Sequence, residues 1–519
     1  MIDLITGDDL TALMASDELF AVFDVRERGE YHECQIPDAT SLPRSQIECR
    51  IAELVPNRSV PIALYDEGGE RARLAAKTLA ELGYERISIL DGGLASWRGE
   101  GRATVSGVNV PSKAFGEQVY HENAVPDLSP EDLKRLLDGA AKPVILDMRT
   151  PEEYGRFCIP GGVNVPGGEL ILWAEELREK PLVVVHCAGR TRGIIGAAAL
   201  RRLGLTNVKA LRNGTMGWVL AGFELDTKPG REPALAPAKS KEAAVALARR
   251  IAQEEHLEQL SPGDLIGAMA DADRSVTYLV DVRSETEYEA GHIAGSIHVP
   301  GGQAVQRADD FIAVRNAQIV FISDRAVRAT MAAYWYRRMG FPNVRVLHGG
   351  LAAWTRHGGP LASGPSLNPP PGMETARRAA RFIDANSLSE KVASGSTVVL
   401  DVGPSLDFAA AHVPGAKWIS RGWLESKIPQ QFDRGQSMAL SCPDGVQSAF
   451  AARALRAIGY TDVSVLDGGT RAWSAAGLPT ARGLDACLVE PNDAVLSPSV
   501  RGDKEEMRRY LDWETKLRH

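Results

Sequence analysis

One pattern of residues occurs four times in this chain of 519 residues, and it constrains the fold more than any other feature. Each copy begins with a short apolar run that ends in Asp, and then passes through a turn, a second apolar run, a polar loop and an Ala-rich segment to a Trp. The first loop position and the closing Trp are 31 residues apart in every copy: Asp66 and Trp97, Cys187 and Trp218, Ser323 and Trp354, Cys442 and Trp473. Repetition at a fixed spacing indicates four copies of one structural unit.

Each copy has the pattern of an α/β domain. The apolar runs lack alternation and are bounded by turn residues, which is typical of strands that are buried on both faces. The segments after them have helical periodicity, as in Ile194, Ala198 and Leu203. Strands that alternate with helices predict a small, mostly parallel sheet flanked by helices.

The spacing of the copies predicts four tandem domains and a tail. A unit of about 100 residues can bury its own core, so each copy is expected to be a domain and not a turn of a solenoid. The linkers between them include a Pro-rich segment, LASGPSLNPPPGME, that is expected to be extended. The expected domains are residues 1–105, 128–228, 258–362 and 383–481, followed by a C-terminal helical tail, 482–519, that docks on a domain.

Composition excludes several classes of function. The net charge is −8, which argues against a nucleic-acid partner because phosphate binding needs clustered Lys and Arg. No stretch approaches the roughly 20 apolar residues of a membrane span, and the N-terminus lacks the features of a signal peptide. Six cysteines without a CxxC pair predict neither a disulfide framework nor a metal site. We therefore expect a cytoplasmic protein with free thiols and no membrane association.

The loop at Cys187 has the features of a nucleophilic thiol site. A cysteine between a buried strand and a helix faces the free N–H groups of the first helical turn, which form an anion site. These groups favour the thiolate and are expected to lower the pKa of the cysteine. Arg190 and Arg192 are expected to add positive charge for an anionic substrate, and Gly189 and Gly193 to let the backbone come close.

The motifs DVR…EY, His-Ile-Pro-Gly, the loop cysteine and LDGG…W, in this order and spacing, resemble the rhodanese (thiosulfate sulfurtransferase) family. The resemblance covers all four copies. It implies a catalytic cysteine at the first loop position, which Cys187 and Cys442 match, whereas Asp66 and Ser323 depart from the pattern.

The resemblance also implies a reaction that needs no cofactor. The thiolate of Cys187 would take the outer sulfur of thiosulfate, or a similar small donor, and pass it from a persulfide to cyanide or a thiol. The residues expected to bind the substrate are Ala188, Gly189, Arg190, Thr191, Arg192 and Gly193.

The fourth loop is the weaker candidate. It has Cys442 but lacks both arginines, since Gln447 takes the place of Arg192. Asp444 adds negative charge beside the thiol, and Gly403 replaces the Arg of the DVR motif. The thiol could use another donor or be a relic. The remaining cysteines (Cys34, Cys49, Cys158 and Cys487) are interpreted as small buried hydrophobes.

Several residues have a structural interpretation. His186 and the Asp–Arg pairs of the DVR motif are expected to support the loop, the closing Trp residues to be core, and the LDGG glycines to form turns. Arg71 and Arg328 correspond to Arg192 and could mark former anion sites or be surface arginines.

Two other functions compete with sulfur transfer. A non-catalytic scaffold or sulfur-binding protein is possible because two of the four loops lack the cysteine. A phosphatase is disfavoured because four residues separate Cys187 and Arg192, one fewer than in related cysteine phosphatases. By analogy with tandem rhodaneses, the first domain is expected to pair with the second and the third with the fourth.

Overall fold

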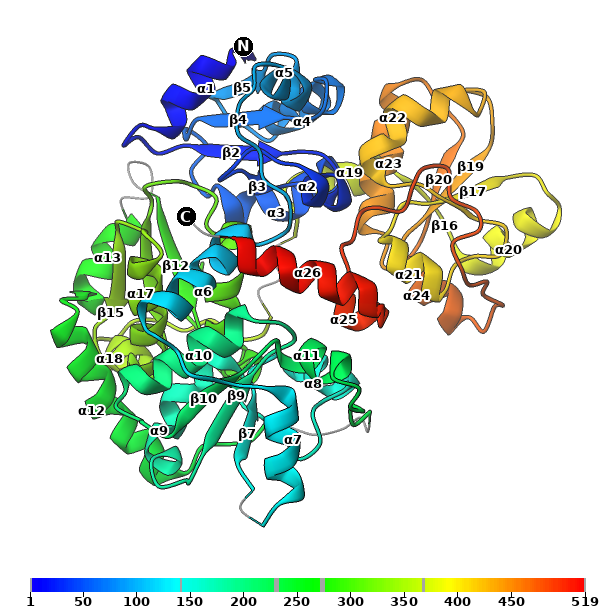
Figure 1. The fold of residues 1–519 in the computed structure, drawn as a ribbon. Helices are drawn as coiled ribbons and strands as arrows, with labels where there is room; N and C mark the ends of the chain where they lie inside the picture. Colours follow the sequence, from blue (N-terminus) through cyan, green and yellow to red (C-terminus); the bar gives the residue numbers. More distant parts are fainter. Residues whose placement is uncertain (1, 141, 228–232, 271–275, 366–368, 518–519) are drawn as a thin grey trace. The chain divides into compact units, whose positions relative to one another are not determined.

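The computed structural model contains four five-stranded parallel sheets, each flanked by helices (Figure 1). It describes residues 2–140, 142–227, 233–270, 276–365 and 369–517. In each sheet the strand order is 1-5-4-2-3 by position in the domain, and every pairing is parallel. In chain order the strands are β1 (Asp3–Ile5), β2 (Ala21–Asp24), β3 (Thr40–Ser41), β4 (Ile62–Tyr65), β5 (Ile87–Leu90); β6 (Asp127–Leu128), β7 (Val144–Asp147), β8 (Val163–Asn164), β9 (Val183–His186), β10 (Val208–Leu211); β11 (Glu258–Leu260), β12 (Thr277–Asp281), β13 (Ile297–His298), β14 (Gln318–Ile322), β15 (Val344–Leu347); β16 (Arg381–Ile383), β17 (Val398–Asp401), β18 (Lys417–Trp418), β19 (Met438–Ser441) and β20 (Val463–Leu466).

The helices repeat from domain to domain in the same order. The α-helices are α1 (Gly7–Met14), α2 (Arg28–Glu33), α3 (Ile47–Leu54), α4 (Glu70–Glu81), α5 (Gly93–Gly99), α6 (Val110–Glu122), α7 (Pro130–Asp138), α8 (Pro151–Arg156), α9 (Leu170–Leu177), α10 (Thr191–Arg202), α11 (Gly214–Leu220), α12 (Ala238–Glu254), α13 (Pro262–Ala270), α14 (Glu285–Ala290), α15 (Gly301–Gln306), α16 (Ala308–Phe311), α17 (Val327–Arg338), α18 (Gly350–Arg356), α19 (Met373–Ala379), α20 (Ala385–Ala393), α21 (Ser405–Ala410), α22 (Leu424–Lys427), α23 (Val446–Ala457), α24 (Gly469–Ala475), α25 (Pro498–Arg501) and α26 (Lys504–Lys516). Short 3₁₀ helices are η1 (Arg44–Gln46), η2 (Gly167–Glu169), η3 (Arg421–Trp423) and η4 (Ile428–Gln430).

The second domain shows how the pattern of the sequence produces these layers. All four residues of β9 are buried, as expected for a strand covered on both faces. Helices α7 and α11 cover one face, where Leu133 and Trp218 pack on Val184. Helices α9 and α10 belong to the opposite layer. The central strand therefore ends in a buried position, from which the loop of Cys187 emerges.

The domains pair differently from the expectation. The first and fourth domains form one compact unit, Met1–Val108 with Asn368–Val495, and the second and third form the other, Asn109–Leu367, together with Leu496–His519. The expected pairing of neighbours, first with second and third with fourth, is wrong. The segment expected as a linker after the first domain instead contains α6, which belongs to the second unit.

Two helices of the second unit, α10 and α17, are buried on nearly every side. In α10 every residue from Thr191 to Leu200 is buried, and in α17 every residue from Val327 to Tyr336. A helix that covers only its own sheet keeps an exposed face, as α4 does. The second face of α10 is covered mainly by α6, and that of α17 by α12 and α15. The two domains meet where η2 contacts α15 and where α9 contacts α17. Within the described ranges, no helix has the length and apolarity required to cross a lipid bilayer.

Candidate active site

The loop of the second domain begins where the central strand ends. Cys187 follows β9 directly, and α10 begins four residues later at Thr191. The carboxyl ends of parallel strands are the usual location of ligand sites in open α/β sheets. The side chain of Cys187 is nevertheless enclosed, with the residue only 3% exposed.

The loop amides point at the first side chain of the loop, and the other three domains show this best. In the first domain the carboxylate of Asp66 accepts hydrogen bonds from the amides of Gly69, Arg71 (2.6 Å) and Ala72 (3.2 Å). In the third, the hydroxyl of Ser323 accepts one from Ala329 at 3.2 Å. The loop therefore provides N–H donors for an anion at this position, and Asp66 supplies that anion from the chain itself.

The two cysteine loops receive the same donors. The Sγ atom of Cys442 accepts hydrogen bonds from the amides of Gly445 at 3.1 Å and Ser448 at 3.5 Å. The amides of Gly189 and Gly193 lower the pKa of Cys187. Backbone donors to a sulfur stabilise a thiolate or a persulfide anion.

The turn that contains Gly214, just before the closing Trp, contacts the loop of Cys187. The amide of Thr215, at the start of α11, donates to the carbonyl oxygen of Cys187 at 3.0 Å. Gly214 has a φ of 53°, and a Cβ atom there would lie 2.1 Å from the same carbonyl oxygen. The equivalent contacts recur in all four domains, where a Cβ would meet the carbonyl of the first loop residue at Gly93, Gly214, Gly350 and Gly469. The glycine is therefore required for close approach as well as for the turn.

The arginines of the loop are engaged in ion pairs. Arg192 makes two hydrogen bonds with Glu153 of α8, at 2.6 and 2.8 Å. Arg190 pairs in the same way with Glu117 of α6, at 2.5 and 2.8 Å. Each arginine is therefore paired with a carboxylate, and the expectation that both bind an anionic substrate stays a prediction.

The corresponding arginines of the non-cysteine loops have the same arrangement. Arg71 pairs with Glu30 and Arg328 with Glu287, and both arginines are buried. The interpretation of these two as surface arginines is wrong. Since the pair persists where the cysteine is absent, it supports the loop in three of the domains.

Burial raises the pKa of Cys187, contrary to the expectation from the sequence. Desolvation is the largest cause, because a charged sulfur loses water in an enclosed loop. Arg192 and the loop amides act in the opposite direction, and the carboxylate of Glu514 adds to the increase. The helix N-terminus alone therefore does not predict the ionisation of this thiol.

Helix α26 covers the loop of Cys187, although no motif in the sequence links this helix to the site. Helix α26, red in Figure 1, packs beside α6 and α11. Its residues Met507 and Leu511 form a small apolar cluster with Ala188 and Met216. The helical spacing predicted this helix and its docking, but no motif indicated which domain or which surface it would cover.

His186 has the structural role that was expected. It is fully buried, and its Nδ1 lies 3.1 Å from the carbonyl oxygen of Cys187. Burial lowers the pKa of its imidazole, which favours the neutral ring.

The fourth loop has a different environment. Cys442 is buried, and burial raises its pKa. Gln447, in the place of Arg192, accepts a hydrogen bond from Arg421 at 2.8 Å, and its amide donates to the Sγ of Cys49 at 3.5 Å. Cys49 is therefore partly buried beside this loop and is not simply a core residue.

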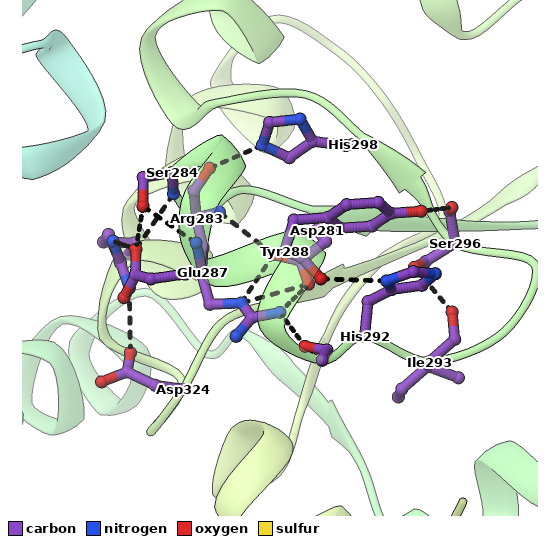
Figure 2. A network of polar contacts seen from close by, with 12 residues as sticks. Asp281, Arg283, Ser284, Glu287, Tyr288, His292, Ile293, Ser296, His298 and Asp324 are labelled. Atoms are coloured by element: carbon purple, nitrogen blue, oxygen red, sulfur yellow. Dashed lines mark hydrogen bonds and ion pairs between the residues drawn. The ribbon is translucent and has the colours of Figure 1, made fainter. Parts of the chain in front are cut away.

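The Asp–Arg pairs of the DVR motif are hydrogen-bonded as expected. In the third domain the guanidinium of Arg283 donates to the carboxylate of Asp281, from Nε at 2.9 Å and from Nη2 at 2.6 Å (Figure 2). Its Nη2 also donates to the carbonyl oxygen of Gly291 at 2.7 Å. In the same network Ser284 caps the start of α14, and the carboxylate of Glu287 accepts a hydrogen bond from the amide of Ser284. Equivalent pairs join Asp24 to Arg26 and Asp147 to Arg149.

The closing tryptophans are buried, as expected for core residues. The Nε1 of each donates to a carbonyl oxygen six residues further along the chain, at 2.8 to 2.9 Å: Trp97, Trp218, Trp354 and Trp473.

Comparison with known families identifies these units. The family model described as the Rhodanese-like domain matches residues 6–100, 129–221, 261–357 and 384–476. The chain belongs to this family, and the expected four rhodanese-like domains are confirmed.

The chain also resembles individual proteins along different parts of its length. The crystal structure of a thiosulfate sulfurtransferase from Pseudomonas aeruginosa is 39% identical, with a TM-score of 0.92 over 99% of this chain and 97% of that chain. A thiosulfate sulfurtransferase from Azotobacter vinelandii is 28% identical over 251 residues, which are 40% of this chain and 91% of the relative. A sulfurtransferase from Allochromatium vinosum is 32% identical over 106 residues, 20% of this chain and 97% of the relative.

Proposed function

We propose that the protein is a sulfurtransferase in which Cys187 carries the transferred sulfur as a persulfide. The observation that carries the proposal is the position of Cys187, at the point where the loops of the other domains bring backbone donors onto the side chain of the first residue. A terminal persulfide sulfur is an anion that such donors would stabilise. The sulfurtransferases among the relatives support the class of reaction.

The proposed reaction has two displacement steps. The thiolate of Cys187 attacks the outer sulfur of thiosulfate, the S–S bond of the donor breaks, and sulfite leaves with the bonding electron pair. A nucleophilic acceptor, cyanide or a thiolate, then attacks the outer sulfur of the persulfide, and Cys187 leaves as a thiolate. Thiosulfate as the donor is part of the proposal and rests on the relatives.

The environment of the thiol suits this route. His186 directs Nδ1 toward a backbone carbonyl and burial lowers the pKa of its ring, so the proposed route assigns it no proton transfer. Stabilisation of the thiolate is therefore assigned to Arg192 and the loop amides, which lower its pKa against the effect of burial. The four-residue spacing between Cys187 and Arg192 disfavours the phosphatase alternative.

The test is turnover of thiosulfate and cyanide by the full chain and by Cys187→Ser, Cys442→Ser and the double substitution. We expect Cys187→Ser to lose at least about a thousandfold in kcat/KM, because the covalent intermediate cannot form. Mass spectrometry of the wild-type chain after thiosulfate should show one added sulfur on the peptide that contains Cys187.

Each result has a defined meaning. Cys442→Ser serves as the matched control, since it removes a thiol from an equivalent loop. Loss of turnover only in Cys442→Ser would move the activity to the fourth domain. A wild-type chain that forms no persulfide and shows no turnover would favour the scaffold interpretation.

A further inference from the structure

A carboxylate from the far end of the chain lies against the loop of Cys187. Glu514 of α26 is 2% exposed. Its Oε1 accepts hydrogen bonds from the hydroxyls of Tyr510 at 3.1 Å and Thr191 at 3.4 Å. Its Oε2 lies 2.9 Å from the position that a Cβ of Gly189 would take, so it contacts the loop two residues after the cysteine.

The second oxygen of this carboxylate is unsatisfied. Across the described residues, Oε2 of Glu514 has no hydrogen-bond partner although it is buried. A buried carboxylate oxygen without a donor is destabilising, and such a group calls for an explanation. The atom lies beside the backbone of Gly189, two residues from Cys187.

Glu514 adds a charge beside a loop whose two arginines already have carboxylate partners. Arg192 is paired with Glu153, and Arg190 with Glu117. Lys113 of α6 adds one more cation, with its ammonium group 5.0 Å from the ring centre of Tyr510 and 4.9 Å from that of Trp513. The carboxylate of Glu514 acts on the thiol itself, since it raises the pKa of Cys187, whereas the protonated acid carries no charge.

The ionisation of Glu514 is sensitive to this environment. Burial raises its pKa, and the negative charge of Glu117 adds to the increase. Lys113, the hydroxyl of Tyr510 and Arg190 lower the pKa, but burial is the largest effect. Thiosulfate carries two negative charges, so it would be repelled by the carboxylate and not by the carboxylic acid.

We propose that Glu514 determines the charge of the sulfur donors that reach Cys187: its carboxylate disfavours anionic donors, and its protonated form admits them. This inference rests on the proposed role of Cys187. It assigns to the C-terminal helix a specificity residue that lies more than 300 positions from the nucleophile in the sequence. A donor without net charge, such as a neutral persulfide, would be less affected.

A pair of alkylating reagents tests charge selection without relying on turnover. Iodoacetate and iodoacetamide have nearly the same size and both react with the thiolate, but only iodoacetate is an anion. The ratio of their rates at Cys187, followed by mass spectrometry of its peptide in the full chain, therefore cancels the thiolate fraction and most of the effect of access. Glu514→Gln keeps the shape of the side chain and removes its charge.

We expect Glu514→Gln to raise the iodoacetate-to-iodoacetamide ratio by about tenfold at pH 8, as the loss of one nearby charge predicts. The matched control is Glu505→Gln, an exposed glutamate of the same helix, which should leave the ratio within about twofold. An unchanged ratio in folded Glu514→Gln, or an equal change in Glu505→Gln, would overturn the proposal.

A second measurement does not depend on any variant. In the wild-type chain the same ratio should rise toward the acidic end of a pH series from about 9 to about 5, because burial raises the pKa of Glu514 above that of a free glutamate and iodoacetate stays ionised. A ratio that is constant over this range would also overturn the proposal.

The experiments distinguish a failure of the proposed sulfur transfer at Cys187 from a failure of the proposed charge selection by Glu514. A chain without thiosulfate turnover whose alkylation ratio still responds to Glu514→Gln would contradict sulfur transfer from thiosulfate and support charge selection. A chain with turnover through Cys187 and an unresponsive ratio would support the proposed function and overturn the role of Glu514. Where both hold, Glu514→Gln should increase kcat/KM for thiosulfate at pH 8.

Discussion

At the scale of single residues, the four loops share one backbone structure and differ in the side chain at the first loop position. Backbone donors of similar geometry reach the carboxylate of Asp66, the hydroxyl of Ser323 and the sulfur of Cys442. The loop of Asp66 holds a fixed anion and so cannot accept another. A change of one side chain therefore separates a loop that could hold a sulfur anion from one that is already filled.

The glycine under the loop gives a prediction at this scale. Gly214→Ala would place a Cβ 2.1 Å from the carbonyl oxygen of Cys187 and force the loop to move. We expect a loss of more than about 3 kcal/mol in the free energy of unfolding, and a loss of persulfide formation. Urea unfolding measures the first and mass spectrometry the second.

Gly222 is the matched control for this substitution. It has a positive φ of 88° in the same domain, but a Cβ there would meet nothing within 4 Å. Gly222→Ala should therefore cost only the backbone strain, about 1 kcal/mol. Equal costs for the two variants would show that the contact with the loop carbonyl has no effect.

At the scale of elements, α26 closes the loop of Cys187 through a small apolar contact. Met507 and Leu511 bind the helix to Ala188 and Met216, and the helix brings Glu514 to its place. A contact of this size can open without unfolding of the domain beneath it. Access to the thiol is therefore expected to follow the stability of the helix and not that of the sheet.

Truncation of one anchor tests this expectation. Leu511→Ala should weaken docking by about 2–3 kcal/mol and increase the rate of Cys187 alkylation by iodoacetamide, with the core of the domain intact. Arg508→Ala, on the exposed side of α26, is the control and should change the rate little. If Leu511→Ala leaves the alkylation rate as in the wild type, then the helix does not limit access.

At the scale of the whole molecule, the units join domains that are distant in the sequence. The first and fourth domains share contacts that include the ion pair of Arg421 with Glu48 and the hydrogen bond from Ser420 to Glu27, at 2.6 Å. Glu27 is buried there, and desolvation raises its pKa to about 7. The contact between these two domains therefore includes a carboxyl group that keeps its proton up to about pH 7.

Glu27 predicts a pH dependence of stability for this unit. Its pKa is about 7 in the folded chain against 4.5 for the free side chain, so the unfolded state loses the proton first as the pH rises. The stabilisation is complete below pH 4.5 and is lost on passing to pH 7, by up to about 3 kcal/mol. Glu27→Gln should therefore be more stable than the wild type at pH 8, with the difference vanishing near pH 4.

Hydrogen exchange of peptides from the first and fourth domains measures this difference. Glu33→Gln, an exposed glutamate of the same helix α2, is the control and should show no such gain at pH 8. A wild-type chain whose first and fourth domains are equally protected at pH 5 and pH 8 would contradict the raised pKa of Glu27.

Local patterns in the sequence determined the domains themselves. The apolar runs, the fixed spacing to the closing Trp and the loop after the central strand predicted four α/β units and the positions of Cys187 and Cys442, because each depends on neighbours within about 100 residues. The Asp–Arg pairs and the core tryptophans followed from the same local pattern. Because these features recur in four copies, a single sequence is enough to predict them.

The tertiary structure alone decided how the domains pair and how the thiol is ionised. The pairing depends on contacts of η2 and α9 in the second domain with α15 and α17 in the third, between residues far apart in the sequence. The raised pKa of Cys187 depends on burial by α6 and α26, and on Glu514, which no local pattern connects with the loop. Desolvation and long-range charge act through space, so residues far apart in the sequence set the chemistry of a site that a short motif locates.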